Sequence, residues 1–268
     1  MSWIAYLEQN QSRFIDELLE FISIPSVSSS DENFQDVVRA GDWVVSRLKS
    51  AGIDNARIMA TETHPVVYGD WLNAGDESPT VLIYGHFDVQ PADPLELWDN
   101  PPFEPVVKDE KIYGRGATDD KGNMLAPILA VEALLKSGAK LPVNIKFFFE
   151  GQEEIGSPTL APFVKANAEL LRADMIISAD GSQYGEDQPS LIRGLKGLMG
   201  CEICVTGAKG DQHSGMHGGG IANPVHALSH LIASMKDLEG KINIEGFYND
   251  VEELKVADRK AIAEIPFD

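Results

Sequence analysis

The sequence predicts an α/β fold in which a sheet is flanked by helices, and three observations lead to this prediction. Short apolar runs typical of buried strands are spread along the chain. Longer segments with helical periodicity alternate with these runs, which favours a sheet covered by helices. The length of 268 residues exceeds what a single core usually fills, so we expect two domains.

The first expected elements are two helices. One runs through the N-terminal stretch up to Pro25, and the other covers residues 33–50 and is ended by Ala51-Gly52. The apolar runs predict strands at residues 66–72, 80–84, 143–149 and 175–178, with helices at residues 121–137 and 159–171. Pro127 lies inside the first of these later helices, so we expect a kink there.

The character of the sequence changes near residue 193. We place a domain at residues 1–192 and a smaller one at residues 193–268. The smaller domain is expected to contain a strand at residues 198–206, a Gly-rich loop, and a helix that begins at Asn223-Pro224 with the chemistry of a helix start. One strand and one or two helices cannot bury a sheet face alone, so we expect this domain to be incomplete.

The composition is strongly acidic, with 22 Lys and Arg against 42 Asp and Glu and a net charge of −20. Such a surface repels phosphate, which argues against nucleic acid and anionic membranes as partners. The N-terminus lacks the basic start and apolar run of a signal peptide, and no stretch approaches the roughly 18 apolar residues of a membrane span. We therefore expect a cytoplasmic location.

The two cysteines, Cys201 and Cys204, form a C-x-x-C pattern that raises the alternatives of a redox or zinc site. Their neighbours are apolar and β-prone, and three steps along a strand span about 10 Å, beyond the roughly 7 Å that a disulfide tolerates. A structural zinc site would need a second ligand pair nearby, which the sequence does not offer. We therefore interpret both as buried strand cysteines.

Residues suited to metal binding follow the expected strands where each strand ends, or stand at the entrance to a helix. They are His86, Asp88, Asp119, Asp120, Glu153, Glu154 and Asp180. Each alone has an ordinary explanation as a rim histidine, a helix cap or a turn residue. Ligands of open α/β sheets gather beyond the carboxyl ends of the strands, and capping does not explain why these residues gather there together.

Metal chemistry supplies a reason for this gathering. Histidine nitrogen and carboxylate oxygen are suitable zinc ligands, and one carboxylate can bridge two ions. In two-metal hydrolases the ions lie about 3.5–4 Å apart and lower the pKa of a shared water. Such a site also needs a carboxylate that orients the histidine and a free carboxylate that takes the water proton. The H-x-D and Glu-Glu pairs fit these two needs.

The segments GHFDVQP, GRGATDDKG, EGQEEIGS, SADG and DQHSGMHGG, in this order, resemble the zinc aminopeptidase-like family. This family includes carnosine dipeptidases, aminoacylase, succinyl-diaminopimelate desuccinylase and glutamate carboxypeptidases. The resemblance covers nearly the whole chain, including IPSVS at residues 24–28. It implies a zinc-aminopeptidase-like catalytic sheet with a smaller α+β lid or dimerisation domain, and a homodimer formed through that domain.

The resemblance implies a role for each metal ligand. His86 and Asp180 would hold one zinc, Asp119 would bridge both zincs, and Glu154 would hold the second. It also implies a cis peptide between Asp119 and Asp120. Manganese or cobalt in place of zinc remains open, because mixed histidine and carboxylate ligands suit all three metals.

The resemblance also assigns the catalytic residues. Asp88 would orient His86, and Glu153 would act as general base and then as proton donor to the leaving amine. His213, in DQHSG, matches the histidine that stabilises the tetrahedral oxyanion, which in dimeric members reaches the active site of the partner subunit.

Members of this family are longer than this chain, so we expect that the chain is C-terminally truncated and that its catalytic domain is incomplete. Their chain returns from the lid to supply a second zinc-ligating histidine and an arginine for the substrate carboxylate. The remaining histidines do not match that ligand; they are His64, His217, His226 and His230. A zinc held only by Asp119 and Glu154 would bind more weakly.

The leading hypothesis is a zinc metallopeptidase, a hydrolase of peptide or amide bonds in small substrates with a free carboxylate, of the dipeptidase or carboxypeptidase type. N-acyl amino acid deacylation is the alternative within the family. An inactive fragment or dimerisation scaffold is the alternative outside catalysis. Nucleotide binding through Gly114-Arg115-Gly116 is disfavoured, because Asp119 stands where the required third glycine should be.

Overall fold

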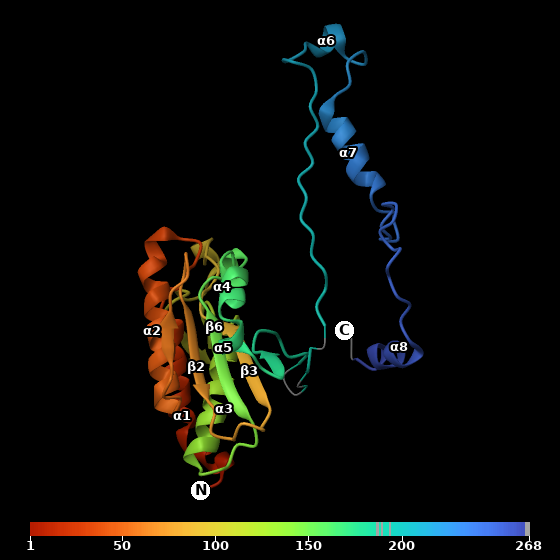
Figure 1. Ribbon diagram of the computed structural model, residues 1–268. Coiled ribbons are helices and arrows are strands. Elements are labelled where there is room, and N and C mark those ends of the chain that lie inside the picture. The colour runs from red at the N-terminus through yellow and green to blue at the C-terminus, as the bar shows by residue number, and fades with distance from the viewer. Residues whose placement is uncertain (186–187, 189, 193, 266–268) are drawn as a thin grey trace. The chain divides into compact units, whose positions relative to one another are not determined.

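The computed structural model describes residues 1–185, 188, 190–192 and 194–265 (Figure 1). The chain divides into two compact units, Met1–Arg193 and Gly194–Asp268. Residue 193, near which the sequence changes character, lies outside the described residues. The assignment of residues 1–192 and 193–268 as two incomplete domains stays a prediction.

The first unit is built on a mixed five-stranded sheet in the order β1-β2-β6-β3-β7 (Figure 1). The strands are β1 (Arg57–Met59), β2 (Val66–Trp71), β3 (Thr80–His86), β6 (Asn144–Glu150) and β7 (Met175–Ser178). Strands β6, β3 and β7 are parallel, while β2 runs antiparallel to both of its neighbours. With helices on both faces, this sheet confirms the predicted α/β class.

The register of the parallel strands brings their carboxyl ends to one edge of the sheet. His86, the last residue of β3, pairs with Glu150, the last residue of β6. Ser178, the last residue of β7, pairs with Tyr84 of β3. The loops that follow these three strands therefore begin side by side, as the sequence predicts.

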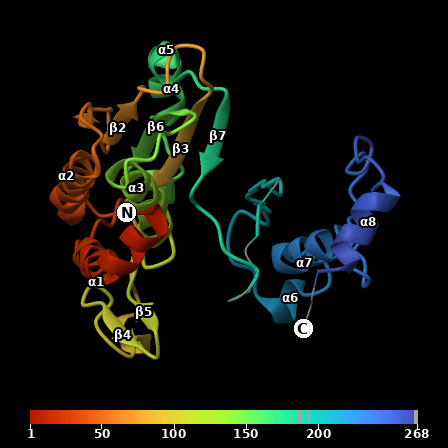
Figure 2. The ribbon, with the colours of Figure 1, turned by 90° about the horizontal axis from the view of Figure 1, so that it is seen from below.

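Alternation of side chains along β6 gives the sheet two apolar faces. Phe147 and Phe149 lie in the main core, which is completed by the helices α1 (Trp3–Ile22), α2 (Phe34–Ala51) and α3 (Lys121–Lys136) (Figure 2). Phe148 packs in a smaller cluster on the other face, against residues of α4 (Leu160–Ala166) and α5 (Ala168–Leu171). This is the period of two that strands impose.

The first unit differs from the expected elements in several details. The edge strand β1 was not predicted. The single helix expected at residues 159–171 is broken at Asn167, whose side-chain amide donates to the carbonyl of Phe163. A hairpin that the sequence analysis missed, β4 (Val106–Lys108) and β5 (Lys111–Tyr113), turns through Asp109 and Glu110 at positive φ. Helix α3 runs through Pro127, and the kink there stays a prediction.

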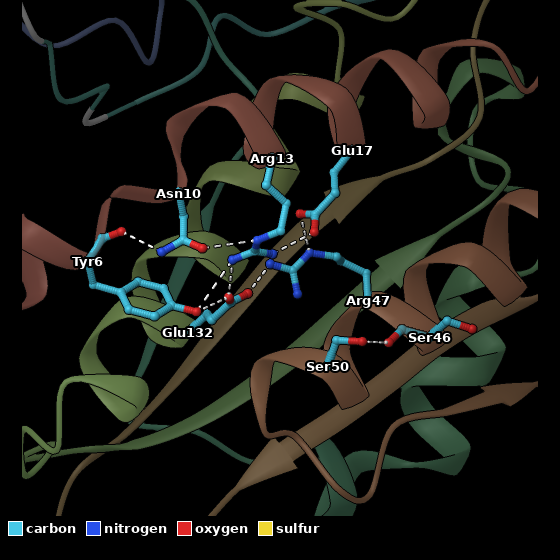
Figure 3. Close-up of polar contacts among 8 residues, drawn as sticks. All are labelled: Tyr6, Asn10, Arg13, Glu17, Ser46, Arg47, Ser50 and Glu132. Carbon is cyan, nitrogen blue, oxygen red and sulfur yellow. Dashed lines mark hydrogen bonds and ion pairs between the residues drawn. The ribbon is translucent and has the colours of Figure 1, made fainter. Parts of the chain in front are cut away.

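A cluster of charged side chains connects the three helices of the main core (Figure 3). Glu132 of α3 is almost fully buried and pairs with Arg13 of α1, at 2.5 Å, and with Arg47 of α2. Glu17 of α1 pairs with the same two arginines at 2.6 and 2.8 Å. The Tyr6 hydroxyl adds a 2.7 Å hydrogen bond to Glu132. These contacts fix how α1, α2 and α3 pack.

The second unit contains α6 (Ser214–His217), α7 (Pro224–Ser234) and α8 (Val256–Ala263). The start of α7 is confirmed, because the side chain of Asn223 accepts a hydrogen bond from the amide of Val225. The strand expected at residues 198–206 is wrong, since none of these residues belongs to a strand. No other strand is described in this unit to pair with it, and a strand depends on such a partner for its backbone hydrogen bonds.

The environment expected for the two cysteines is wrong for the same reason. Cys201 and Cys204 are both exposed and free rather than buried in a strand. A strand buries its side chains only when it lies in a sheet that packs on a core, and these residues lie in no sheet.

Across the part of the chain that the structure describes, no helix combines the length and the apolar character needed to cross a membrane.

Candidate metal centre

Three of the predicted ligands meet at the carboxyl edge of the sheet. His86 ends β3, Asp180 lies in the loop after β7, and Asp119 lies in the loop before α3. One ligand atom from each lies within 4.8 Å of the others. The Nε2 atom of His86 is 3.0 Å from Asp119 Oδ1 and 3.9 Å from Asp180 Oδ2. His86 is fully buried, whereas the Asp119 side chain is 64% exposed, so the group is open on one side.

The hydrogen bonding of His86 shows that this group fits a metal ion. Its Nδ1 atom lies 3.0 Å from the backbone carbonyl of Asp88, and a carbonyl only accepts, so Nδ1 carries the proton. The Nε2 atom then faces the carboxylates of Asp119 and Asp180. A bare nitrogen lone pair facing two carboxylates is repulsive, so a positive charge is favoured there, either as a second proton on Nε2 or as a metal ion. A divalent ion ligated by one imidazole and two carboxylates meets that need.

The pKa of His86 reflects the negative charge of the surrounding carboxylates. Burial alone would lower it, but the hydrogen bond with Asp88 and the charges of Asp88, Asp120 and Glu153 raise the pKa to about 10. The carboxylates thus favour a cation at this position strongly enough to overcome the cost of burial.

Asp88 connects His86 to the Glu-Glu pair. Its carboxylate accepts hydrogen bonds from the backbone amides of Glu153, at 3.2 Å, and Glu154, at 3.1 Å. Its Oδ1 atom is 3.5 Å from His86 Nδ1, farther than its own carbonyl oxygen. Asp88 therefore contacts His86, which it was predicted to orient, and its role as the orienting residue stays a prediction. Its contacts with the Glu-Glu pair were not predicted from the sequence.

Glu153 and Glu154 lie in a short 3₁₀ turn (Glu153–Ile155) after β6, outside the three-residue group. The carboxylate of Glu154 accepts a 2.8 Å hydrogen bond from Gln90. Burial raises the pKa of both carboxyls, and the charge of Asp180 raises that of Glu153 further. A raised pKa brings a carboxylate closer to the range of an effective proton acceptor.

Asp120 is a site residue whose contacts the sequence analysis missed. Its carboxylate makes no capping bond at the start of α3; instead Oδ2 accepts a 3.0 Å hydrogen bond from the backbone amide of His86. Burial raises the pKa of Asp120 to about 7. The peptide bond between Asp119 and Asp120 is cis, which confirms the expectation from the motif resemblance. The only signal for its contacts was its place beside Asp119 in DDKG.

Further supporting contacts lie beneath the site. Asn123, in the first turn of α3, donates a 2.7 Å hydrogen bond to the carbonyl of Gly181, next to Asp180. The Tyr84 hydroxyl donates to Glu150 at 2.6 Å, across the ends of β3 and β6. Sequence alone gives no signal for these pairs, because the first depends on how α3 lies against the loop after β7 and the second on the strand register. Gln90, which donates to Glu154, could have been found from the sequence, because it stands within the GHFDVQP motif.

His213 belongs to the second unit. Its Nδ1 atom accepts a hydrogen bond from the amide of Gly215 at the start of α6. Its predicted action on an oxyanion stays a prediction.

The fold is an α/β sheet flanked by helices, and at its carboxyl edge one histidine and two aspartates could together hold a metal ion. Residues 82–262 match the model of Peptidase family M20/M25/M40. The chain belongs to this family, which confirms the relationship predicted from the motifs.

Several of the proteins to which this chain is similar are named as dipeptidases. A Cys-Gly metallodipeptidase of Candida albicans is 36% identical over 261 residues, which cover 91% of this chain and 54% of that protein. Human Beta-Ala-His dipeptidase is 33% identical over 260 residues, covering 92% and 51%. The solved structure of the dipeptidase Dug1p from Saccharomyces cerevisiae superimposes with a TM-score of 0.78 at 30% identity, covering 99% and 58%. The chain spans about half the length of the curated relatives it matches.

Proposed function

We propose that this protein is a metal-dependent hydrolase that cleaves the peptide bond of small substrates with a free carboxylate, of the dipeptidase type. The observation that carries the proposal is the convergence of His86, Asp119 and Asp180 ligand atoms within 4.8 Å. The similarity to proteins named as dipeptidases supports the substrate class.

His86, Asp119 and Asp180 would hold a divalent metal ion, which we propose to be zinc, with manganese and cobalt as alternatives. Asp119 and Glu154 would hold a second ion. When bound, the metal polarises the scissile carbonyl and lowers the pKa of a water molecule. His86 would present its Nε2 atom to this ion, because its Nδ1–H donates a hydrogen bond to the backbone carbonyl of Asp88.

Glu153 is the proposed general base. Its backbone is held by Asp88, and burial raises its pKa. It accepts the proton of the attacking water and then returns it to the leaving amine. His213 would donate a hydrogen bond to the oxyanion, in the partner subunit of a homodimer formed through the second unit.

The test is metal analysis of the 268-residue chain together with a substrate panel. We expect bound metal and release of free amino acids from Cys-Gly and β-Ala-His, both lost in Asp119→Asn. Hydrolysis of N-acyl amino acids alone would instead identify a deacylase. Absence of both metal binding and turnover would favour the scaffold alternative.

A further inference from the structure

The segment at residues 24–28, Ile-Pro-Ser-Val-Ser, follows the end of α1 and lies against the turn that carries His86 and Asp88. Ser26 is fully buried. Its hydroxyl donates a 2.6 Å hydrogen bond to the carbonyl of Phe87, and its own carbonyl accepts a 2.9 Å hydrogen bond from the amide of Val89. Val27 and Val89 form a parallel bridge. Ser26 therefore holds the backbone on both sides of Asp88, and among the described hydrogen bonds none joins Ser26 to Asp88 itself.

The same segment is also fixed to the loop that carries Asp119. Lys121, two residues after Asp119, is fully buried. Its ammonium group donates hydrogen bonds to the carbonyls of Ile24, at 2.6 Å, and Phe21, at 2.9 Å. Residues 24–28 thus lie between the two loops that supply His86 and Asp119, with a polar contact to each.

We propose that Ser26 is a positioning residue for the metal centre. It fixes the Phe87–Val89 backbone, so that the Asp88 carbonyl meets His86 Nδ1 and the Asp88 carboxylate meets the amides of the Glu-Glu pair. Its effect on the metal rests on the function proposed above; its effect on the turn does not. A purely structural serine would instead satisfy buried backbone groups and change only global stability.

Hydrogen exchange on the metal-free 268-residue chain separates these two roles. In Ser26→Ala we expect the amides of Glu153 and Glu154 to exchange about tenfold faster, although both are hydrogen-bonded to the Asp88 carboxylate and not to Ser26. The amide of Phe147, in the centre of β6, reports global unfolding and should change much less. Ser46→Ala is the matched control, because Ser46 also donates its hydroxyl to a backbone carbonyl, but on the exposed face of α2. It should leave all three amides unchanged.

Unchanged hydrogen exchange at Glu153 and Glu154 in Ser26→Ala would overturn the proposal. An equal acceleration of exchange at the Phe147 amide would also overturn it.

Titration with Co²⁺ extends the test to the metal: we expect Ser26→Ala to raise the Kd about tenfold, as loss of a supporting contact does. A parent chain that does not bind Co²⁺ would contradict the proposed metal function, while the exchange data would still decide the role of Ser26. A parent that binds, with an unchanged Kd in Ser26→Ala, would contradict positioning of the metal ligands.

Discussion

Glu153 and Glu154 are adjacent carboxylates with different hydrogen-bond partners, and we have proposed different roles for them. The Glu154 carboxylate accepts a hydrogen bond from Gln90, whereas no described residue donates a hydrogen bond to the Glu153 carboxylate. We predict that Glu153→Ala keeps metal content and thermal stability nearly intact but lowers the turnover of active enzyme by about 10²–10⁴-fold. Glu154→Ala should lower metal content instead. Metal analysis and initial rates on both variants check this, and zinc loss in Glu153→Ala would mean that the two roles are exchanged.

His86, Asp119 and Asp180 could be predicted from the sequence as candidate ligands, because each stands in a motif at the end of a strand or beside a helix. The contacts of Asp120 could not be predicted from the sequence. Its carboxylate accepts from the His86 amide, and this pairing exists only once β3 and the start of α3 are side by side. Contacts of this kind depend on backbone placement rather than on residue type.

At the scale of elements, strands were predictable where the fold supplies a partner. The apolar run at residues 175–178 forms β7 because β3 lies beside it. The equally β-prone run at residues 198–206 forms no strand, since strand propensity reflects pairing and burial more than an intrinsic backbone preference. Helix α2 was predictable to within a residue at each end because its stop signal, Gly52 at φ 101°, is local.

The contact between β3 and α3 depends on a glycine. A Cβ at Gly85 would lie 2.6 Å from Asp120 Oδ2 and 2.9 Å from Met124 Cβ. We predict that Gly85→Ala lowers the free energy of unfolding by about 2 kcal/mol through overpacking and also weakens metal binding. Gly41→Ala is the control: its Cβ would meet only ordinary contacts at 3.5 Å, and alanine should stabilise α2 by about 1 kcal/mol. Urea unfolding measures the stability of both variants, and metal titration measures their affinity. Equal effects of Gly85→Ala and Gly41→Ala on stability would refute the packing argument.

The ion cluster that connects α1, α2 and α3 gives stability a pH dependence. Burial would raise the pKa of Glu132, but hydrogen bonds from Tyr6, Arg47 and Arg13 lower it below its ordinary value of 4.5. The stabilisation is therefore complete above pH 4.5 and is lost as the pH falls through the lowered pKa. We predict that Glu132→Gln lowers the free energy of unfolding by about 3 kcal/mol at pH 7, because Arg13 and Arg47 each lose one of their two charged partners, the one that is buried.

This deficit should shrink as the pH falls below 4.5, where the parent loses the same charge. Urea unfolding across the pH range measures it. Glu8→Gln, on the exposed surface of α1, should change stability by less than about 0.5 kcal/mol at every pH. A deficit independent of pH would show that shape, not charge, matters at Glu132.

At the scale of the whole molecule, the proposed ligands and base are confined to Met1–Arg193, although the net charge of −20 covers the entire chain. A metal that binds the folded site at 100 times its Kd should stabilise that unit by about 2.7 kcal/mol. We predict that Zn²⁺ slows hydrogen exchange at Ile83 in β3 and leaves the amides of α7 unchanged, and that a chelator reverses this. Asp119→Asn should abolish the effect.

Mg²⁺ at the same concentration is the matched control, because it neutralises surface charge equally but prefers six oxygen ligands. Equal protection of both units, or equal protection by Mg²⁺, would show that the ions act by relieving the repulsion of the acidic surface rather than by occupying the group of His86, Asp119 and Asp180.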